Sequence, residues 1–104
     1  MDKLAALNEI LQIDPSNAFA RYGLAMEQIS RGNPEAALAE FAACVQHNPD
    51  YVPAYQMWAQ TLVTLDRIPE ALERLHAGIA AANCTGNQHA LAEMEAMREE
   101  LTTR

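Results

Sequence analysis

The sequence is poor in cysteine, in glycine and in basic residues, and these shortages exclude several classes of protein. Its 104 residues include two cysteines, Cys44 and Cys84, which are too few and too far apart to form a disulfide framework. Seven basic residues against fourteen acidic ones leave a net charge of -7 at pH 7. That charge repels phosphate backbones and anionic lipid, so we expect no nucleic-acid or membrane partner and favour a neutral or basic protein.

Long apolar runs are also missing from the chain. No stretch approaches the roughly 18 apolar residues that a membrane helix needs, and residues 1–4 do not begin a signal peptide. Two unpaired cysteines suit a reducing compartment. We therefore expect a cytoplasmic location.

Residue patterns that support catalysis are scarce as well. His47, His76 and His89 lie far apart in the sequence, so no pair has the close helical spacing of a metal site. Phosphate-binding glycine patterns and nucleophile motifs are absent. We expect Cys44 to be a small buried residue, whereas Cys84 is the more accessible thiol but has no basic neighbour in the sequence. The sequence predicts no catalytic centre, metal or cofactor; an enzyme using Cys84 and a histidine is the weakest alternative.

A 34-residue repeat runs through the chain. The offset places Pro15 on Pro49 and matches residues by size: Ala20 with Ala54, Ala25 with Ala59, Ala37 with Ala71, Leu38 with Leu72, and Phe41 with Leu75. Applied backwards, it places three leucines of the N-terminal segment in the same columns: Leu4 with Leu38, Leu7 with Phe41, and Leu11 with Val45. A period of this length is typical of helical repeats, and the N-terminal segment supplies half of one.

Each repeat contains two predicted helices, because its apolar residues recur at steps of three and four. Ser16 and Asp50 share a column and suit the N-cap of the first helix in each repeat. Gly32 can end that helix in a left-handed conformation, and Asn33 with Pro34 suits the start of the second helix.

The second turn and the C-terminal segment depart from this pattern. Asp66 stands where Gly32 stands in the preceding repeat, so we expect the same hairpin with an altered turn. Residues 83–87 are rich in turn formers and predict a loop, in which Thr85 and Gln88 have the spacing of a capping box. A closing helix follows, and its apolar stripe comprises Ala90, Leu91, Met94, Met97 and Leu101. The expected organisation is a single domain, 1–104, made of a half-repeat helix (1–14), two repeats (15–48 and 49–82), and a loop with a capping helix (83–104).

These columns resemble the tetratricopeptide repeat, a helix-turn-helix repeat with large and small residues at fixed positions. The matching residues are Leu24, Trp58, Phe41 and Leu75 among the large ones, Ala25, Ala59, Ala37 and Ala71 among the small ones, and the closing prolines Pro15 and Pro49. Arg21 departs from the pattern at a position that is usually aromatic, whereas Tyr55 in the next repeat conforms. The resemblance covers about residues 4–82. It implies an all-α fold in which about six helices form antiparallel hairpins stacked as a short right-handed superhelix, as in small bacterial members of the family.

The resemblance also implies a concave groove lined by the first helix of each repeat. The groove positions carry Phe19, Tyr22, Met26, Ile29 and Ser30 in one repeat and Pro53, Gln56, Gln60, Val63 and Thr64 in the next. This apolar and amide-rich surface suits an extended peptide or an amphipathic helix. It lacks the lysines and asparagines with which some members bind a terminal carboxylate.

We therefore predict a non-catalytic protein-interaction module that binds an unidentified protein or peptide in this groove. The predicted contact residues are Phe19, Tyr22, Met26, Ile29, Gln56, Gln60 and Val63. Two alternatives stay open: the apolar members of this set are covered as core by the terminal helices, or the chain is a self-assembly unit. In the second case it would form a homodimer that buries Met94, Met97 or the edge of the repeats.

Overall fold

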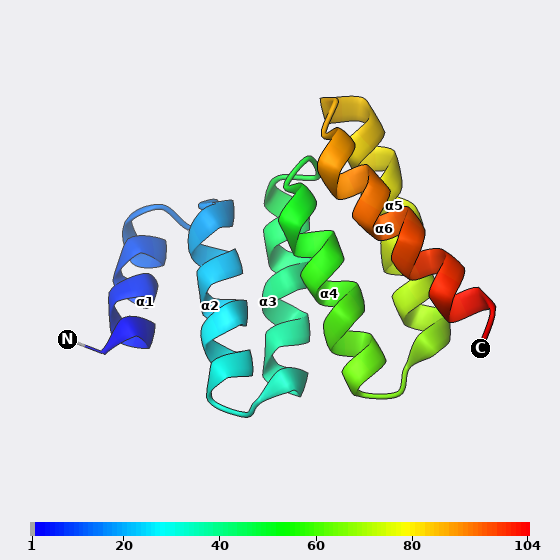
Figure 1. The fold of residues 1–104 in the computed structure, drawn as a ribbon. Coiled ribbons are helices and arrows are strands. Elements are labelled where there is room, and N and C mark those ends of the chain that lie inside the picture. The colour runs from blue at the N-terminus through cyan, green and yellow to red at the C-terminus, as the bar shows by residue number, and fades with distance from the viewer. Residues whose placement is uncertain (1) are drawn as a thin grey trace. The chain divides into compact units, whose positions relative to one another are not determined.

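A computed structural model describes residues 2–104, and over that range the chain forms six α-helices and no strand (Figure 1). The helices are α1 (Lys3–Ile13), α2 (Ala18–Ser30), α3 (Pro34–His47), α4 (Val52–Thr64), α5 (Ile68–Thr85) and α6 (Gln88–Thr102). The predicted all-α class with about six helices is confirmed. Among the described residues, no helix is long and apolar enough to cross a membrane.

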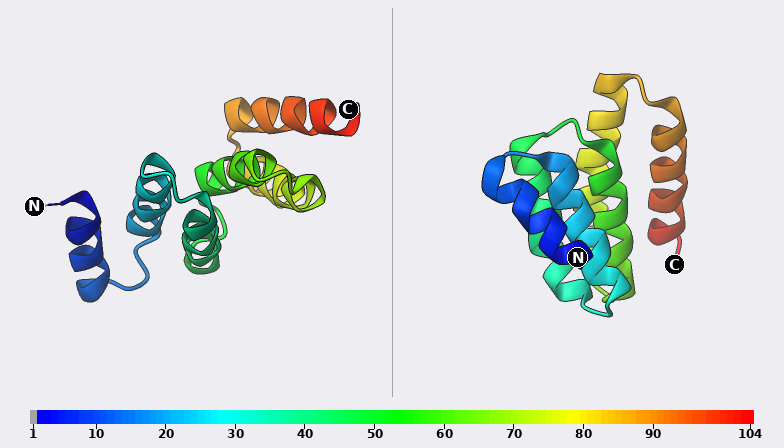
Figure 2. Two further views of the ribbon diagram at one scale, coloured as in Figure 1. Left: turned by 90° about the horizontal axis from the view of Figure 1, so that it is seen from below. Right: turned by 90° about the vertical axis from the view of Figure 1, so that its left-hand side faces the viewer.

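The helices belong to two compact units. The first ends at Pro49 and contains α1, α2 and α3, in which each helix runs antiparallel to the one before it (Figure 1). The second begins at Asp50 and contains α4 and α5 as a hairpin, with α6 packed along α5 and also touching α4 (Figure 2). The boundary lies one residue from the start of the second predicted repeat.

The first helix of each repeat begins one residue later than predicted. Asn17, rather than Ser16, is the N-cap of α2, and its Oδ1 accepts a hydrogen bond from the backbone N–H of Ala20 at 2.9 Å. The Ser16 hydroxyl donates to Asp14 Oδ1 instead. Asparagine and serine are about equally good N-caps, so residue type alone does not choose between neighbours.

The N-cap of α4 is likewise Tyr51 and not Asp50. Pro53 lies in the first turn of α4, where its restricted φ angle suits the helix and its missing N–H leaves no intrahelical bond unmade.

The turns inside the two hairpins have the same geometry despite their different residues. Gly32 has φ +81°, and Asp66 has φ +58° at the equivalent position. In each turn the next residue donates its backbone N–H to a carbonyl five residues earlier, Asn33 to Gln28 and Arg67 to Leu62, both at 2.8 Å. Aspartate tolerates the left-handed region better than most residues, so the hairpin forms as predicted, but the expectation of an altered turn is wrong.

The predicted loop at residues 83–87 is largely helical. Helix α5 continues to Thr85, whose hydroxyl donates to the carbonyl of Ala81 at 2.9 Å, and it ends at Gly86 with φ +72°. Thr85 therefore does not cap α6; the N-cap is Asn87, which accepts from the N–H of Ala90. Threonine can bond within a helix, and Gly86 is the first residue here that reverses the chain at low cost.

The core of each unit consists of the columns identified from the repeat. Ala37 and Phe41 on α3 are completely buried, and so are Ala71 and Leu75 on α5. Alanine at these positions lets two helix backbones approach, and the large residue one turn later fills the space beside the crossing. In α1 only Leu11 is buried.

Charged residues link the two helices of each hairpin in different ways. In the first unit Arg21 on α2 pairs with Glu40 on α3 at 3.4 Å. In the second unit Arg74 replaces Glu40 in the repeat, and its guanidinium lies over the Trp58 ring at 4.5 Å from the centroid. The departure of Arg21 from the aromatic pattern is therefore accommodated by an ion pair within the hairpin.

Candidate functional site

A hollow of about 420 Å³ lies between α1 and α2 in the first unit. We call it the α1–α2 hollow; its lining residues are Lys3, Leu7, Phe19, Tyr22, Gly23, Met26, Glu27 and Ser30. Three of the predicted contact residues, Phe19, Tyr22 and Met26, lie here on successive turns of α2. The repeat spacing thus places them on one side of the helix.

The wall of this hollow is apolar and partly open to solvent. Phe19 keeps 68% of its surface exposed, which is unusual for so large an apolar residue. A Cβ added at Gly23 would lie 3.0 Å from Leu7 Cδ2, so the glycine lets the Leu7 side chain come close to the α2 backbone. Leu7 therefore lies along α2 and forms the floor of the hollow.

Tyr22 is held by the neighbouring helix. Its ring is tilted by 57° to the ring of Phe41 on α3, with the centroids 6.2 Å apart, which is a favourable aromatic arrangement. Burial, together with the nearby Cys44, raises the pKa of the Tyr22 phenol. The phenol is therefore neutral near pH 7 and can take part in hydrogen bonds without carrying charge.

Cys44 lies behind Tyr22 and supports it. The thiol is fully buried and lies 3.2 Å from the carbonyl oxygen of Ala18, to which it donates. Burial raises the pKa of Cys44 to about 11. The thiol is therefore neutral at physiological pH and acts as a small core residue, as predicted.

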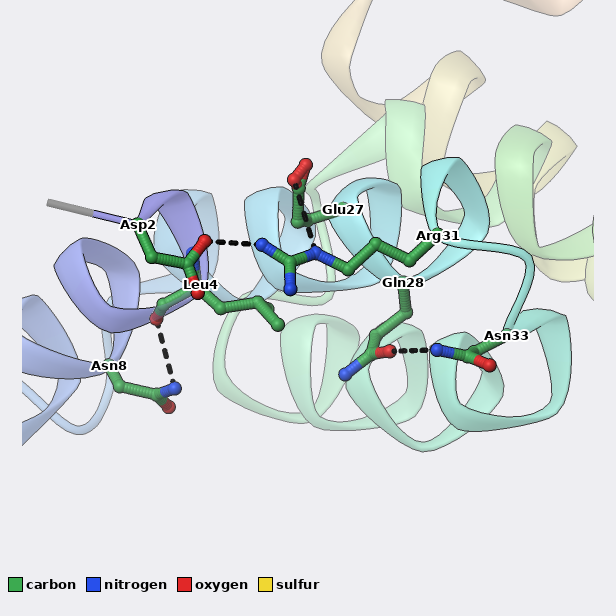
Figure 3. Close-up of polar contacts among 7 residues, drawn as sticks. All are labelled: Asp2, Leu4, Asn8, Glu27, Gln28, Arg31 and Asn33. Atoms are coloured by element: carbon green, nitrogen blue, oxygen red, sulfur yellow. Dashed lines mark hydrogen bonds and ion pairs between the residues drawn. The ribbon is translucent and has the colours of Figure 1, made fainter.

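Arg31, at the C-terminal end of α2, connects the two helices of the α1–α2 hollow. Its guanidinium pairs with Asp2, the N-cap of α1, and with Glu27 at 3.8 Å, one turn earlier on α2 (Figure 3). These contacts are exposed on the Arg31 and Asp2 side, so they add little stability. The Arg31 guanidinium does, however, compensate the negative charge of the Glu27 carboxylate, which lines the hollow.

A second hollow, of about 560 Å³, lies between α4 and α6 in the second unit. We call it the α4–α6 hollow; its lining residues are Gln56, Gln60, Val63, Glu93, Ala96, Met97, Glu100, Leu101 and Arg104. Three further predicted contact residues, Gln56, Gln60 and Val63, are among them. Two amides and two carboxylates make this lining far more polar than that of the α1–α2 hollow.

One carboxylate of the α4–α6 hollow has a cation beside it: Arg104 lies 3.5 Å from Glu100. His89 Nε2 lies 3.0 Å from Glu93 Oε1 on an exposed edge. The amides of Gln56 and Gln60 each offer both donors and an acceptor. Such a surface can bond a peptide backbone.

Ile29 is the one predicted contact residue that lines neither of these hollows, and it is half-buried on α2. Sequence reasoning also missed one wall of each hollow, because it treated α1 and α6 only as terminal covers. The missed signal is a second N-cap: Asn87 repeats Asn17 at a 70-residue spacing, two more than twice the repeat period, because α5 is longer than α3. With that spacing, the buried Ala90 and Met94 of α6 fall on the buried Ala20 and Leu24 of α2.

Residues with possible catalytic or metal chemistry are dispersed. Within residues 2–104, no group of three or more His, Cys, Asp or Glu side chains is placed to hold a metal ion. Cys84 is exposed near the end of α5, and neither hollow includes it. The two hollows are consequently the candidate binding surfaces of the chain.

Comparison with solved structures supports a repeat fold. The crystal structure of a tetratricopeptide repeat domain protein from Salinibacter ruber is 32% identical, with a TM-score of 0.77 over 84% of this chain and 97% of that one. The TPR2B domain of yeast Sti1, in complex with pHsp70, has a TM-score of 0.88 at 19% identity, covering 96% of this chain and 80% of that one. PcrH, in complex with the chaperone binding region of PopD, has a TM-score of 0.89 at 20% identity, covering 97% and 77%.

The sequence itself also matches a family model. Residues 28–94 match the model of the tetratricopeptide repeat, which is more than half of the chain. A comparison with curated proteins gives no significant match. On the family model and the Salinibacter similarity together, the chain belongs to the tetratricopeptide repeat family.

Proposed function

We propose that this chain is a non-catalytic interaction module and that each of its two hollows can bind a peptide or helix of a partner protein. The observation that carries the proposal is the exposure of Phe19 at the edge of the apolar α1–α2 hollow. Exposed apolar surface that borders a concavity is typical of interaction sites. Family membership supports the same function.

The α4–α6 hollow would contribute polar recognition. Gln56 and Gln60 lie one turn apart on α4, where their amides can bond the backbone of an extended segment. Glu93 and Glu100 add negative charge to the same lining. A neutral or basic segment therefore fits this hollow better than an acidic one, in agreement with the net charge of -7.

Two structures of the same fold contain a bound partner. Sti1 is in complex with pHsp70, and PcrH is in complex with the chaperone binding region of PopD. Both are about one-fifth identical to this chain, so they support the class of function and not the identity of a ligand.

The test is a selection of peptides from a random display library on the immobilised full chain. We expect selected peptides to lose at least tenfold in affinity when Met26→Glu is introduced. Gln46→Glu, an exposed change on α3 outside both hollows, is the matched control and should leave the affinity unchanged. Peptides that bind both variants equally well would contradict a site at Met26.

A self-assembly unit is the second candidate, because three large apolar residues are exposed in the first unit: Ile10, Ile13 and Phe19. Met94 cannot form such an interface as the structure stands, because it is completely buried within the second unit. Sedimentation across a hundredfold concentration range distinguishes the candidates. A monomer throughout supports the interaction module, whereas a dimer at low concentration supports self-assembly.

The remaining expectations are part of the same proposal. We propose that the chain has no catalytic activity and no cofactor, and a cytoplasmic location stays a prediction from its two free cysteines. Labelling of native protein at neutral pH tests the thiol alternative. A Cys84 rate far above that of a simple thiol in solution would argue for a reactive site.

A further inference from the structure

Helix α1 carries the columns of the second helix of a repeat, but its neighbours differ from those of α3 and α5. The 34-residue offset relates three positions along one face of these helices. The aligned residues are Lys3 with Ala37 and Ala71, Leu7 with Phe41 and Leu75, and Ile10 with Cys44 and Gly78. We call the face formed by Lys3, Leu7 and Ile10 the open face of α1.

The exposure of this face changes from helix to helix. Ala37, Phe41 and Cys44 on α3 are completely buried, and Ala71 and Leu75 on α5 are too. On α1, Ile10 is 41% exposed, Lys3 is exposed and Leu7 is half-buried. The same columns are thus core in two helices and surface in the third.

The preceding helix covers these columns on α3 and α5, and on α5 Met94 of the following helix also lies against Gly78. Cys44 donates to the Ala18 carbonyl of α2, and Phe41 packs on Tyr22 of the same helix. On α5, a Cβ added at Gly78 would lie 2.6 Å from Tyr55 Cβ of α4. Within residues 2–104, α1 has no preceding helix.

Helix α2 lines the other side of the location beside α1 where a preceding helix would lie. The 70-residue spacing aligns Ala20 with Ala90 and Leu24 with Met94, and it also matches the residues of α6 that line the hollow beside α4 to residues of α2. The matches are Glu93 with Gly23, Ala96 with Met26, Met97 with Glu27, and Glu100 with Ser30, and each of these residues lines its own hollow. In the second unit α4 lies beside that wall, so the α1–α2 hollow is the equivalent location for a helix of the α4 type.

We propose that the α1–α2 hollow and the open face of α1 bind an amphipathic α-helix of a partner protein, which packs on α1 as α2 packs on α3 and α4 packs on α5. The helix would lie antiparallel to α1, as α2 does to α3 and α4 to α5. This inference rests on the proposed function, because it specifies the class of partner for one of the two hollows.

Residue size restricts the sequence of the partner helix. Tyr55 of α4 lies directly against Gly78, the smallest residue, whereas Ile10 is large. A large side chain opposite Ile10 would therefore overpack the crossing, so the partner needs alanine, glycine or serine there.

Charge restricts it further. Glu27 in the hollow is paired with Arg31, but among residues 2–104 no ion pair involves Lys3. A carboxylate in the last turn of the partner helix would lie near Lys3, at the start of the antiparallel α1, and would compensate it. A second copy of this chain is a poorer occupant, because each copy carries a net charge of -7.

The probe is a synthetic helix based on α2, the helix that covers α3. It has the sequence of residues 17–31 with blocked ends and with two changes, Arg21→Ala for the position that Tyr55 holds in α4 and Gln28→Glu for the carboxylate. A control peptide carries Leu24→Glu in addition, which interrupts its apolar face. Binding to the isotope-labelled full chain is followed by NMR, which detects millimolar affinity.

We expect amide shifts centred on Leu7, Ile10, Phe19 and Met26, and none with the control peptide. Ile10→Glu in the full chain should raise Kd at least tenfold. Gln12→Glu adds the same charge on the opposite face of α1 and should leave Kd within twofold. Lys3→Glu should weaken binding several-fold at low salt and less at high salt.

Three outcomes would overturn the inference. The first is an absence of shifts on α1 with the probe, and the second is an equal effect of Ile10→Glu and Gln12→Glu. The third is a dimer in sedimentation that Ile10→Glu converts to a monomer, because a second copy would then occupy the face. If library peptides bind in a Met26-dependent manner that Ile10→Glu does not affect, the proposed function stands and this inference fails.

Discussion

Helices α1 and α5 carry the same repeat columns but occupy opposite situations. On α5, Leu75 is completely buried and Gly78 is pressed against Tyr55 of the preceding helix. On α1, the equivalent Leu7 is half-buried and Ile10 is 41% exposed. The comparison teaches that a repeat column predicts which face of a helix can be buried, whereas burial itself requires a neighbouring helix.

The two hollows differ in a corresponding way. The α1–α2 hollow, beside the uncovered helix, has the exposed Phe19 and an apolar wall. The α4–α6 hollow lies between two helices of the same type and has amides and carboxylates in its lining. An apolar surface persists in this chain where a covering helix is absent.

The largest expected difference comes from truncating the same column in both helices. Leu75→Ala should lower the free energy of unfolding by about 2–5 kcal/mol, because it leaves a cavity in a closed core. Leu7→Ala should cost about 1 kcal/mol, because a half-buried side chain loses less contact. Urea unfolding of both variants measures the two values. Equal losses would show that α1 is as well covered as α5.

Cys44 shares a repeat column with the exposed Ile10, but its side chain is completely buried. The burial of this thiol should make the stability of the protein fall at high pH. Burial raises the pKa of Cys44 from 9.0 to about 11. Between pH 9 and pH 11 the thiol ionises more readily in the unfolded chain than in the folded protein. The stabilisation that comes from burying the neutral thiol is therefore complete below pH 9 and is lost as the pH approaches 11. The loss amounts to about 2 kcal/mol. Tyr22, whose pKa is also raised, acts in the same direction.

Unfolding measured from pH 8 to 11 checks this expectation. Cys44→Ala should make the decline shallower, and Cys84→Ser, at an exposed thiol, should leave the decline unchanged. A decline that is the same in all three proteins would exclude Cys44 as its source.

Replacing Gly78 on α5 or Gly23 on α2 by alanine should change the stability of the protein by different amounts. This difference should be smaller than those above. Gly78→Ala should destabilise by about 1–2 kcal/mol, because the new Cβ would meet Tyr55 Cβ at 2.6 Å and Met94 Sδ at 2.7 Å. Gly23→Ala meets only the flexible end of Leu7 at 3.0 Å, and the better helix propensity of alanine offsets that contact. Its thermal midpoint should stay within about 2 °C of the parent. A larger drop for Gly23→Ala would mean that Leu7 is rigidly held.

The smallest effects are expected at the two hairpin turns. Unlike helices α1 and α5, these turns have the same geometry. Asp66→Gly should stabilise by less than about 1 kcal/mol, because glycine adopts φ near +58° without strain. Gly32→Ala should destabilise by about 1 kcal/mol at φ +81°. Chemical unfolding of both variants tests the pair. A gain at Gly32 would show that its turn relaxes to another conformation.

Much of the fold could be predicted from the residues. The 34-residue offset correctly identified Ala37, Phe41, Ala71 and Leu75 as core, because size matching between columns reflects helix crossings. Details of the helix ends could not be predicted as well. Ser16 and Asn17 are equally suitable caps, and only the folded backbone shows that the Asn17 side chain reaches the N–H of Ala20.

The candidate site was predicted on one side only. The columns placed Phe19, Tyr22 and Met26 together on α2 and Gln56, Gln60 and Val63 together on α4. The opposite walls come from α1 and α6, and their contribution depends on the length of α5, which was predicted three residues too short. Ile29 has the same spacing in the sequence but lines neither hollow.

The sequence by itself determined that the chain forms short amphipathic helices in a 34-residue repeat, because apolar spacing, proline and glycine act over a few neighbouring residues. The tertiary structure decided which copies of each column are buried, since burial depends on whether another helix lies against that face. Cys44 and Ile10 occupy one column, yet the first is core and the second is surface. The difference arises because α2 covers Cys44 on α3, whereas no described helix precedes α1 and Ile10 stays 41% exposed.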